Sequence, residues 1–254
     1  MTTRDEDLAR SFDARAADME QARTNRDAGA LSWFVSFAAL VPGAIVLDAG
    51  CGPGLVAEAF LEAGCDVVGI DVSAEMTRRA SARCARFGAR ARFEQCSLSA
   101  FAPAARFDAA VSRFVLHHLD DPRAFVARQA ALVRPGGVVV ALDFTVDPDP
   151  ARAAWANQVH RLRDRTHRRN LSPGELVDSF CSAGLALIRA EEGPSSVDFD
   201  DWFDRGSPVA SREDVRRAFL LGTARGLTPV PRPDGGVDMV SVQMIVRGTA
   251  PAGS

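Results

Sequence analysis

A glycine-rich segment in the first quarter of the chain has the residue types of a nucleotide-binding loop. It reads Val-Leu-Asp-Ala-Gly-Cys-Gly-Pro-Gly over residues 46–54 and follows an apolar run that ends at Asp48. Gly50, Gly52 and Gly54 lack Cβ atoms, so the backbone can turn sharply and approach a ligand closely. A helix that starts directly after such a loop directs its N-terminus at the same ligand.

Two carboxylates near this loop indicate which kind of nucleotide it would bind. Asp71 ends the next apolar run, where an acid can accept hydrogen bonds from both hydroxyls of a ribose. Asp48 stands two residues before the first glycine, where its charge would repel the pyrophosphate of a dinucleotide. The same carboxylate suits a ligand that carries a cationic amino group, and this argues against a dehydrogenase on a related fold.

The elements that must position these residues alternate between strands and helices. Strands are expected at 44–48, 66–71, 90–96, 107–112 and 138–143, and helices at 55–63, 73–86 and 122–133. This alternation predicts an α/β fold, a Rossmann-like three-layer sandwich around a mostly parallel seven-stranded sheet. Later elements are expected as helices at 151–168, 172–183, 198–206 and 211–225, and strands at 184–191 and 239–246. A turn precedes the last strand, so it is expected to be antiparallel.

The pattern also predicts how the chain is divided. Two helix-prone stretches, 1–28 and 30–40, are expected to form an N-terminal helical cap or lid over residues 1–42. Residues 43–254 are expected to form the nucleotide-binding domain, with a helical insert on the substrate side at about 147–183.

Several segments together resemble the class I, Rossmann-like methyltransferases that depend on S-adenosylmethionine. Residues 46–54 resemble the first motif of that class, and Val-Val-Gly-Ile-Asp-Val-Ser at 67–73 resembles the second. Residues 107–112 and 132–140 resemble the segments around its fourth and fifth strands. Within the class, residues 113–122, Arg-Phe-Val-Leu-His-His-Leu-Asp-Asp-Pro, resemble the small-molecule methyltransferases of ubiquinone and menaquinone biosynthesis.

The resemblance implies S-adenosylmethionine as the cofactor, released as S-adenosylhomocysteine, and a set of residues that hold it. Around the methionine end it implies Asp48, Gly50, Cys51, Gly52 and Gly54; at the ribose, Asp71; and beside the adenine, Val72 and Met76. Arg113 could hold the cofactor carboxylate or a substrate anion. Cys96 stands where the family commonly has an Asp, so adenine recognition is expected to depend on Ser97 and the backbone near Leu98.

The four histidines of the chain supply the candidates for the acceptor side. His160, Asp164 and His167 would share one face of the predicted helix 151–168, with His167 as a base that Asp164 orients beside Arg163. Such a site would suit an acidic or phenolic acceptor. The alternative is that the five arginines of residues 161–169 form a solvated surface.

His117 and His118 follow the fourth predicted strand, close to the expected cofactor cleft. We place His118 with Asp164 and His167 as candidate catalytic residues, and His117 with His160 and Arg163 as candidate acceptor-binding residues. The alternative for His118 is that its hydrogen bonds fix the loop.

Composition limits the remaining possibilities. The net charge is −3, and all 30 basic residues are arginines, so Lys and Tyr are absent as general bases. Five scattered cysteines without ligand spacing predict no metal ion and a reduced, cytoplasmic protein. No run approaches the roughly 18 apolar residues that a membrane span requires, so none is expected. We expect methyl transfer to an O, N or C atom of a small molecule, with no nucleic-acid partner, in a monomer or homodimer. The alternatives are an RNA-modifying methyltransferase and a non-catalytic cofactor-binding protein.

Overall fold

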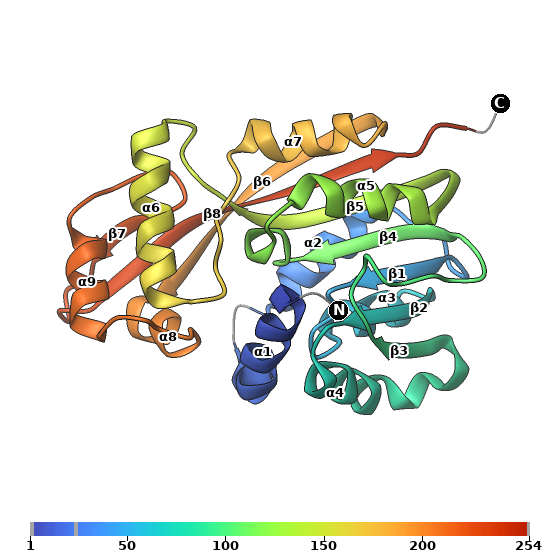
Figure 1. Ribbon diagram of the computed structural model, residues 1–254, viewed down its shortest axis with the longest axis horizontal. Helices are drawn as coiled ribbons and strands as arrows, with labels where there is room; N and C mark the ends of the chain where they lie inside the picture. The colour runs from blue at the N-terminus through green and yellow to red at the C-terminus, as the bar shows by residue number, and fades with distance from the viewer. Residues whose placement is uncertain (1–2, 23–24, 253–254) are drawn as a thin grey trace.

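The computed structural model contains one sheet, in which the strands follow the order β3-β2-β1-β4-β5-β8-β6 (Figure 1). The structure describes residues 3–22 and 25–252. The strands span Ile45–Ala49 (β1), Asp66–Asp71 (β2), Ala91–Gln95 (β3), Phe107–Arg113 (β4), Val133–Thr145 (β5), Ala186–Asp198 (β6), Thr228–Pro231 (β7) and Val237–Thr249 (β8). Strands β1 to β5 are parallel, and β8 lies antiparallel between β5 and β6.

The predicted mostly parallel sheet with an antiparallel last strand is confirmed. The described residues form eight strands, whereas the sequence pattern predicts seven. The additional strand, β7, pairs with the beginning of β8. The sequence pattern does not predict this strand because it contains Pro229 and Pro231. Proline lacks the N–H that a strand ladder needs, so it argues against a strand except at the edge of a sheet.

Helices cover both faces of the parallel strands, which gives the three layers of the predicted sandwich. They span Thr3–Gln21 (α1), Ala28–Ala38 (α2), Leu55–Glu62 (α3), Ala74–Cys84 (α4), Pro122–Leu132 (α5), Pro150–Arg163 (α6), Pro173–Ser182 (α7), Phe199–Asp204 (α8) and Arg212–Leu220 (α9). Apolar side chains of α5 and α7 share one core with the sheet, and those of α2 and α3 share the other. Ser73 caps α4 by accepting the Met76 amide, and Ser172 with Glu175 forms the capping box that begins α7.

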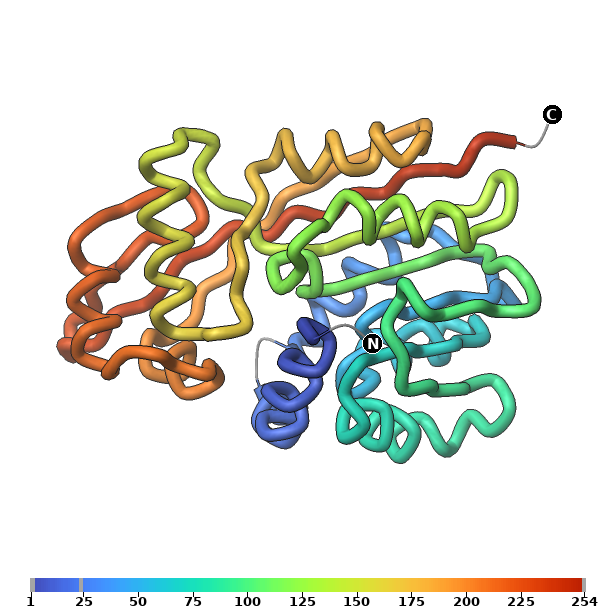
Figure 2. Tube along the Cα trace, viewed as in Figure 1, coloured from blue at the N-terminus to red at the C-terminus, as the bar shows by residue number. Residues whose placement is uncertain are grey.

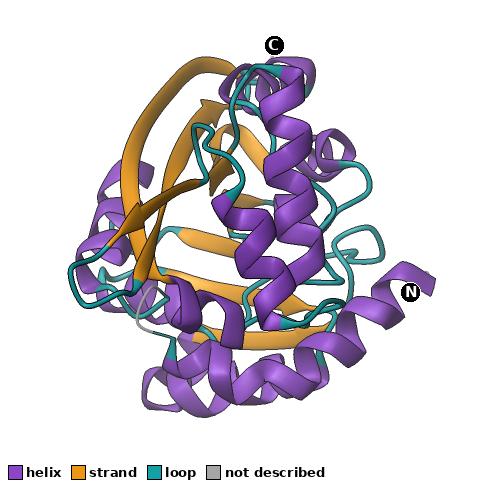
Figure 3. Cartoon of the chain, turned by 90° about the vertical axis from the view of Figure 1, so that its left-hand side faces the viewer, coloured by secondary structure: helices purple, strands orange, loops and turns teal. Residues whose placement is uncertain are grey.

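A smaller lobe projects from one end of the sheet (Figures 1 and 2). The long strands β6 and β8 extend into it, and β7, α6, α8 and α9 complete it around a separate apolar core. Figure 3 views this lobe from its own side, with the helices in front of the strands. Of the insert expected at about 147–183, α6 belongs to this lobe, whereas α7 packs against α5, β6 and β8.

Helix α6 is shorter than the sequence predicts. The prediction of a helix to residue 168 is wrong, because the backbone of Asp164 is extended, with φ −141° and ψ 110°. The Asp164 carboxylate accepts the Thr166 amide at 2.9 Å and the Thr166 hydroxyl at 2.6 Å. This local bonding competes with the helical hydrogen bonds and ends the helix, as short acidic side chains often do.

Helix α1 crosses between the sheet and the smaller lobe. Glu20 pairs with Arg79 and Arg83 of α4, and at the middle of α1 Arg15 pairs with Asp164 after α6. Residues 1–2 and 23–24 of the expected cap over 1–42 lie outside the described residues. Within the described part of the chain, no helix is long and apolar enough to span a membrane.

Candidate active site

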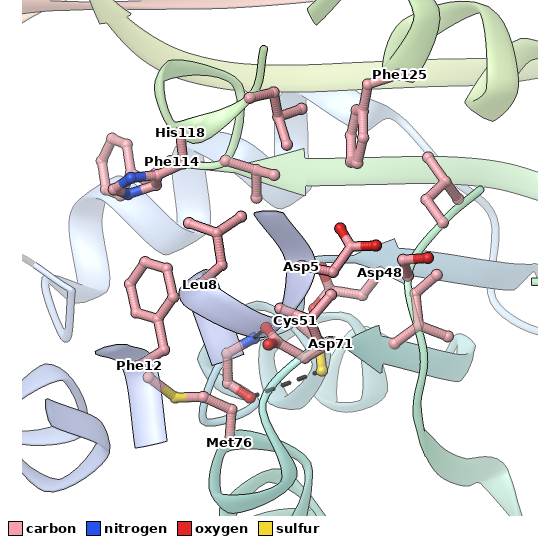
Figure 4. A pocket seen from close by; sticks show the side chains of 18 of the residues that line it. Asp5, Leu8, Phe12, Asp48, Cys51, Asp71, Met76, Phe114, His118 and Phe125 are labelled. Atoms are coloured by element: carbon pink, nitrogen blue, oxygen red, sulfur yellow. Dashed lines mark hydrogen bonds between the residues drawn. The ribbon is translucent and has the colours of Figure 1, made fainter. Parts of the chain in front are cut away.

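The main cavity lies at the carboxyl ends of β1, β2 and β4, and helix α1 borders it (Figure 4). Its volume is about 450 Å³. Eleven of the twelve predicted cofactor residues line it: Asp48, Gly50, Cys51, Gly52, Asp71, Val72, Met76, Cys96, Ser97, Leu98 and Arg113. Ligands of open α/β sheets bind at this edge, so the motif residues meet where the fold predicts a ligand.

Gly54 is the exception, and its assignment to the ligand needs correction. It begins α3 in a left-handed conformation, with φ +82°, and does not line the cavity. A Cβ atom at this position would lie 2.9 Å from the backbone of Ala80 in α4. The absence of a side chain at Gly54 therefore allows α3 and α4 to pack closely beneath the loop.

The glycine loop presents its backbone to the cavity. Gly50 has φ +77° and Gly52 has φ +51°, and the amide of Gly50 donates to the carbonyl of Ile70 at 2.8 Å. A Cβ atom on Gly50 would collide with Val115 at 2.5 Å, whereas one on Gly52 would meet no atom within 4 Å. The backbone at Gly52 therefore borders open space that a ligand can fill.

Asp48 is a buried carboxylate with one oxygen that lacks a hydrogen-bond partner among the described residues. It is 1% exposed, and the oxygen in question is Oδ2. Burial, followed by the nearby Asp71, raises its pKa to about 7. A cationic group placed against Oδ2 would satisfy the oxygen and favour the ionised form.

Asp71 supports the glycine loop and borders the cavity. One carboxylate oxygen accepts the amide of Gly52 at 2.9 Å, and the other accepts the amide of Ser73 at 2.9 Å. Burial raises its pKa, while these amide hydrogen bonds lower it. Each carboxylate oxygen can accept a second hydrogen bond, which leaves capacity for the two hydroxyls of a ribose.

A second, smaller chamber of about 110 Å³ adjoins the main cavity, and the two share Phe12, Met19, Asn25, Phe114 and His118 in their walls. Every predicted acceptor-side residue lines this histidine chamber: His117, His118, His160, Arg163, Asp164 and His167. The structure thus brings together all four histidines of the chain. Among residues 3–22 and 25–252, no group of His, Cys, Asp or Glu side chains is arranged to hold a metal ion.

Comparisons with known proteins agree with this geometry. A family model described as a methyltransferase domain matches residues 22–190. The chain belongs to this family. It is an S-adenosylmethionine-dependent methyltransferase, as the sequence motifs predict.

Individual relatives give the extent of the similarity. The uncharacterized methyltransferase YcgJ of Bacillus subtilis is 31% identical over 170 residues, which cover 66% of this chain and 67% of YcgJ. The ubiquinone biosynthesis O-methyltransferase of Bordetella avium is 32% identical over 162 residues, which cover 61% of this chain and 67% of that protein. The crystal structure of YcgJ superposes with a TM-score of 0.79 at 25% identity, covering 89% of this chain and 99% of that one.

Cys96 and two nearby serines line the part of the cavity where the sequence predicts the adenine end of the cofactor. Cys96 borders the cavity as a neutral thiol, because burial raises its pKa to about 11. The Ser97 hydroxyl lies 3.0 Å from the Ser99 hydroxyl, and both serines line the cavity. The polar side chains at this part of the cavity are therefore neutral: a thiol and two hydroxyls.

Asp164 and His167 do not form the predicted acid–base pair. Asp164 instead pairs with Arg15 at 2.7 Å and with Thr166. His167 shares the oxygen of Asn157, which also accepts the Asn170 amide. The correction follows from the early end of α6, which turns His167 away from Asp164. Since the Asn157 oxygen is an acceptor, the Nε2 of His167 carries the hydrogen.

His117 and His118 are neighbours with different partners. The Nδ1 of His118 lies 3.2 Å from the carbonyl oxygen and 3.1 Å from the hydroxyl of Thr166, and burial lowers the pKa of this ring. The Nδ1 of His117 lies 2.6 Å from Oδ1 of Asp143. The structure thus gives a carboxylate partner to His117 and the loop-fixing contacts to His118. The sequence pattern did not identify Asp143 as a site residue, although it is the last residue of the fifth predicted strand, at a position where ligands bind.

The loop after β4 also carries backbone strain. Phe114 has φ +59°, which is uncommon for a residue with a large side chain. Its ring stacks on Phe144 at 4.6 Å, and it borders both the main cavity and the histidine chamber.

Helix α1 contributes Leu8 and Phe12 to the main cavity (Figure 4). Their spacing of four residues on one helix face is the signal that could have identified them.

Proposed function

We propose that this methyltransferase methylates a small phenolic acceptor, whose ring occupies the histidine chamber while S-adenosylmethionine occupies the main cavity. The aromatic walls of the chamber, formed by Phe114, Phe144 and Trp202, support an aromatic acceptor. Two polar atoms buried among the chamber residues, Nε2 of His160 and Oδ1 of Asn170, have no partner among the described residues. Such atoms favour a ligand that brings its own hydrogen-bonding groups.

A neutral phenol fits this chamber better than a carboxylic acid. Arg15 pairs with Asp164, and Arg163 donates through Nε to the carbonyl of Trp202 at 2.8 Å. These guanidinium groups already have partners, so they offer little to an anionic acceptor. In this proposal, Arg163 and His160 keep the acceptor-binding role that the sequence predicts. Arg163 shapes the wall of the chamber, and His160 offers its Nε2 to the acceptor.

The cofactor residues would act through charge and alignment. The bound cofactor supplies an activated methyl group, and Asp48 would hold its amino group while Asp71 holds the ribose. Backbone groups near Ser97 and Leu98 would recognise the adenine, with Val72 and Met76 beside it. Holding the acceptor and donor in line supplies much of the rate of such a transfer.

Helix α1 would serve as the lid of the site, as proposed for the cap over residues 1–42. It borders both cavities through Phe12 and Met19, and the chamber of about 110 Å³ is smaller than the roughly 150 Å³ cavity that holds benzene. Entry of an acceptor would therefore require α1 to shift. The five free cysteines favour a reducing, cytoplasmic setting.

The proposal is tested by incubating the protein with methyl-labelled S-adenosylmethionine and a panel of simple phenols, and measuring label in the products. Ser195→Phe places a ring into the histidine chamber, whereas Ser196→Phe changes the neighbouring, exposed residue of β6. We expect transfer in the wild type and in S196F, loss of transfer in S195F, and unchanged cofactor affinity by calorimetry. Equal transfer by S195F and S196F would place the acceptor elsewhere.

A further inference from the structure

His117 and Asp143 form a pair at the carboxyl ends of two adjacent strands, β4 and β5. The Nδ1 of His117 lies 2.6 Å from Oδ1 of Asp143. The same carboxylate accepts the amide of Phe144 at 2.7 Å and the amide of His117 at 3.3 Å. Three donors converge on one carboxylate, so Nδ1 is the protonated nitrogen of the ring and Nε2 has the free lone pair.

The pair is placed for proton transfer, because His117 lines the histidine chamber directly beside the main cavity. The side chain of His117 is 12% exposed and that of Asp143 is 4% exposed, so bulk water has little access to their contact. The rings of His118 and His167 lie 4.1 and 5.5 Å from the His117 ring. Burial lowers the pKa of both neighbouring rings, so they add no positive charge against His117 near neutral pH.

We infer that His117 is the general base of the methyl transfer and that Asp143 is its positioning residue. The inference rests on the proposed function. It specifies that the acceptor is a phenol whose hydroxyl is still protonated in solution. As the acceptor O–H bond breaks, the proton passes to Nε2 of His117. The oxygen electron pair forms the new bond to the methyl carbon, and the carbon–sulfur bond breaks with its electron pair remaining on sulfur. The products are the methyl ether, S-adenosylhomocysteine and an imidazolium that Asp143 stabilises.

His118 is the competing base, and its surroundings make it the weaker candidate. Its Nδ1 faces a backbone carbonyl and a hydroxyl of Thr166, so no carboxylate contacts its ring directly. Arg4 donates to the carbonyl oxygen of His118 at 2.8 Å, and Arg15 donates to the Thr166 hydroxyl at 3.3 Å. The His118 ring therefore lies near the opposite charges of Asp164 and Arg15 without touching a carboxylate, whereas the His117 ring contacts the Asp143 carboxylate directly.

The test uses His117→Gln and Asp143→Asn in the full chain with a series of substituted phenols of increasing acidity. In the wild type, we expect turnover to depend weakly on phenol acidity. In H117Q, turnover of the least acidic phenols should fall by on the order of 10²–10⁴-fold, whereas phenols already ionised in solution should retain it. D143N should show the same pattern with a smaller loss. Cofactor affinity measured by calorimetry should be unchanged in both variants.

A binding measurement provides a readout without turnover. With S-adenosylhomocysteine present, p-nitrophenol bound to the wild type should show more phenolate absorbance than the free compound at the same pH, and H117Q should abolish the excess. Bound p-nitrophenol without this excess in the wild type, or uniform loss of turnover across the phenol series in H117Q, would overturn the assignment of the base. Absence of transfer to every phenol by the wild type, with the phenolate signal intact, would instead overturn the proposed acceptor class.

Discussion

Nη1 of Arg15 lies 2.7 Å from Oδ2 of Asp164 and joins helix α1 to the segment after α6, 149 residues later in the chain. The two side chains are only 10% and 6% exposed. Near the C-terminal end of α1, Glu20 pairs with Arg79 and Arg83 of α4, and the helix borders both cavities through Phe12 and Met19. One buried ion pair therefore connects the cofactor side of the site to the acceptor side.

Replacing Arg15 by Met should loosen α1. The change removes the closer cation of the buried Asp164 carboxylate and leaves only the 3.4 Å contact with Arg163, so the cost should be at most about 3–5 kcal/mol, the value typical of a broken buried pair. We expect faster amide hydrogen exchange across Thr3–Gln21 and weaker cofactor binding. The matched control is Arg10→Met, which removes the exposed pair with Asp7 and should cost about 1 kcal/mol or less. Equal exchange in both variants would show that the pair does not hold the helix.

Replacing Asp48 by Asn should stabilise the unliganded protein at high pH and weaken the cofactor. The folded pKa of Asp48, about 7, lies above its ordinary value of 3.8. Its contribution to stability is therefore complete below pH 4 and is lost as the pH rises through 7. D48N should melt at a higher temperature than the wild type at pH 8, and the difference should narrow towards pH 4.

The same substitution predicts the pH dependence of cofactor affinity. Wild-type affinity measured by calorimetry should fall as the pH drops below about 7, because Asp48 becomes neutral. D48N should bind the cofactor about 10- to 100-fold more weakly at pH 8, which corresponds to one charged hydrogen bond of about 1.5–3 kcal/mol. An affinity in D48N equal to that of the wild type would show that Asp48 does not hold the amino group.

Alanine at Gly50 and alanine at Gly52 should have separable effects. Both glycines have positive φ, so each substitution strains the backbone by about 1–3 kcal/mol. Only G50A also drives a Cβ atom into Val115, at 2.5 Å, and should lower stability further in urea denaturation. G52A should remain folded but lose cofactor affinity, since its methyl group occupies ligand space. G52A with wild-type affinity would mean that the ligand does not approach this part of the loop.

Replacing His160 by Phe should reduce the sensitivity of the fold to acid. Burial lowers the pKa of His160 from 6.5 to about 3, so this histidine stabilises the fold above pH 6.5 and ceases to do so as the pH falls towards 3. Phe retains the ring contacts with His167 and Trp202 but cannot titrate. Between pH 6.5 and 3, unfolding free energy should fall less steeply in H160F. Identical slopes would show that His160 is not buried as a neutral ring.

The lining of the main cavity could be predicted in large part from the sequence, since eleven of the twelve residues expected to hold the cofactor border it. Its residues belong to one loop and to the ends of successive strands, so their positions follow from local patterns and from the rule that parallel strands end at one edge. Gly54 is the informative exception, because its contact with Ala80 depends on how α3 and α4 pack.

The acceptor half could be predicted only as a set of residue types. The helical spacing of His160, Asp164 and His167 depends on an uninterrupted helix, and side-chain bonding at Asp164 ends that helix at Arg163. No local pattern indicates that Arg15 is the partner of Asp164.

By itself, the sequence determined the fold class and the methyl donor, and it placed the candidate site at the carboxyl edge of the sheet, because these depend on periodicity and on a contiguous motif. Only the tertiary structure decided which histidine side chain contacts a carboxylate. His117 and Asp143 meet because β4 and β5 pair in register, with Arg113 opposite Leu142. Partners that lie far apart in the chain are chosen by packing and strand register, which no local spacing encodes.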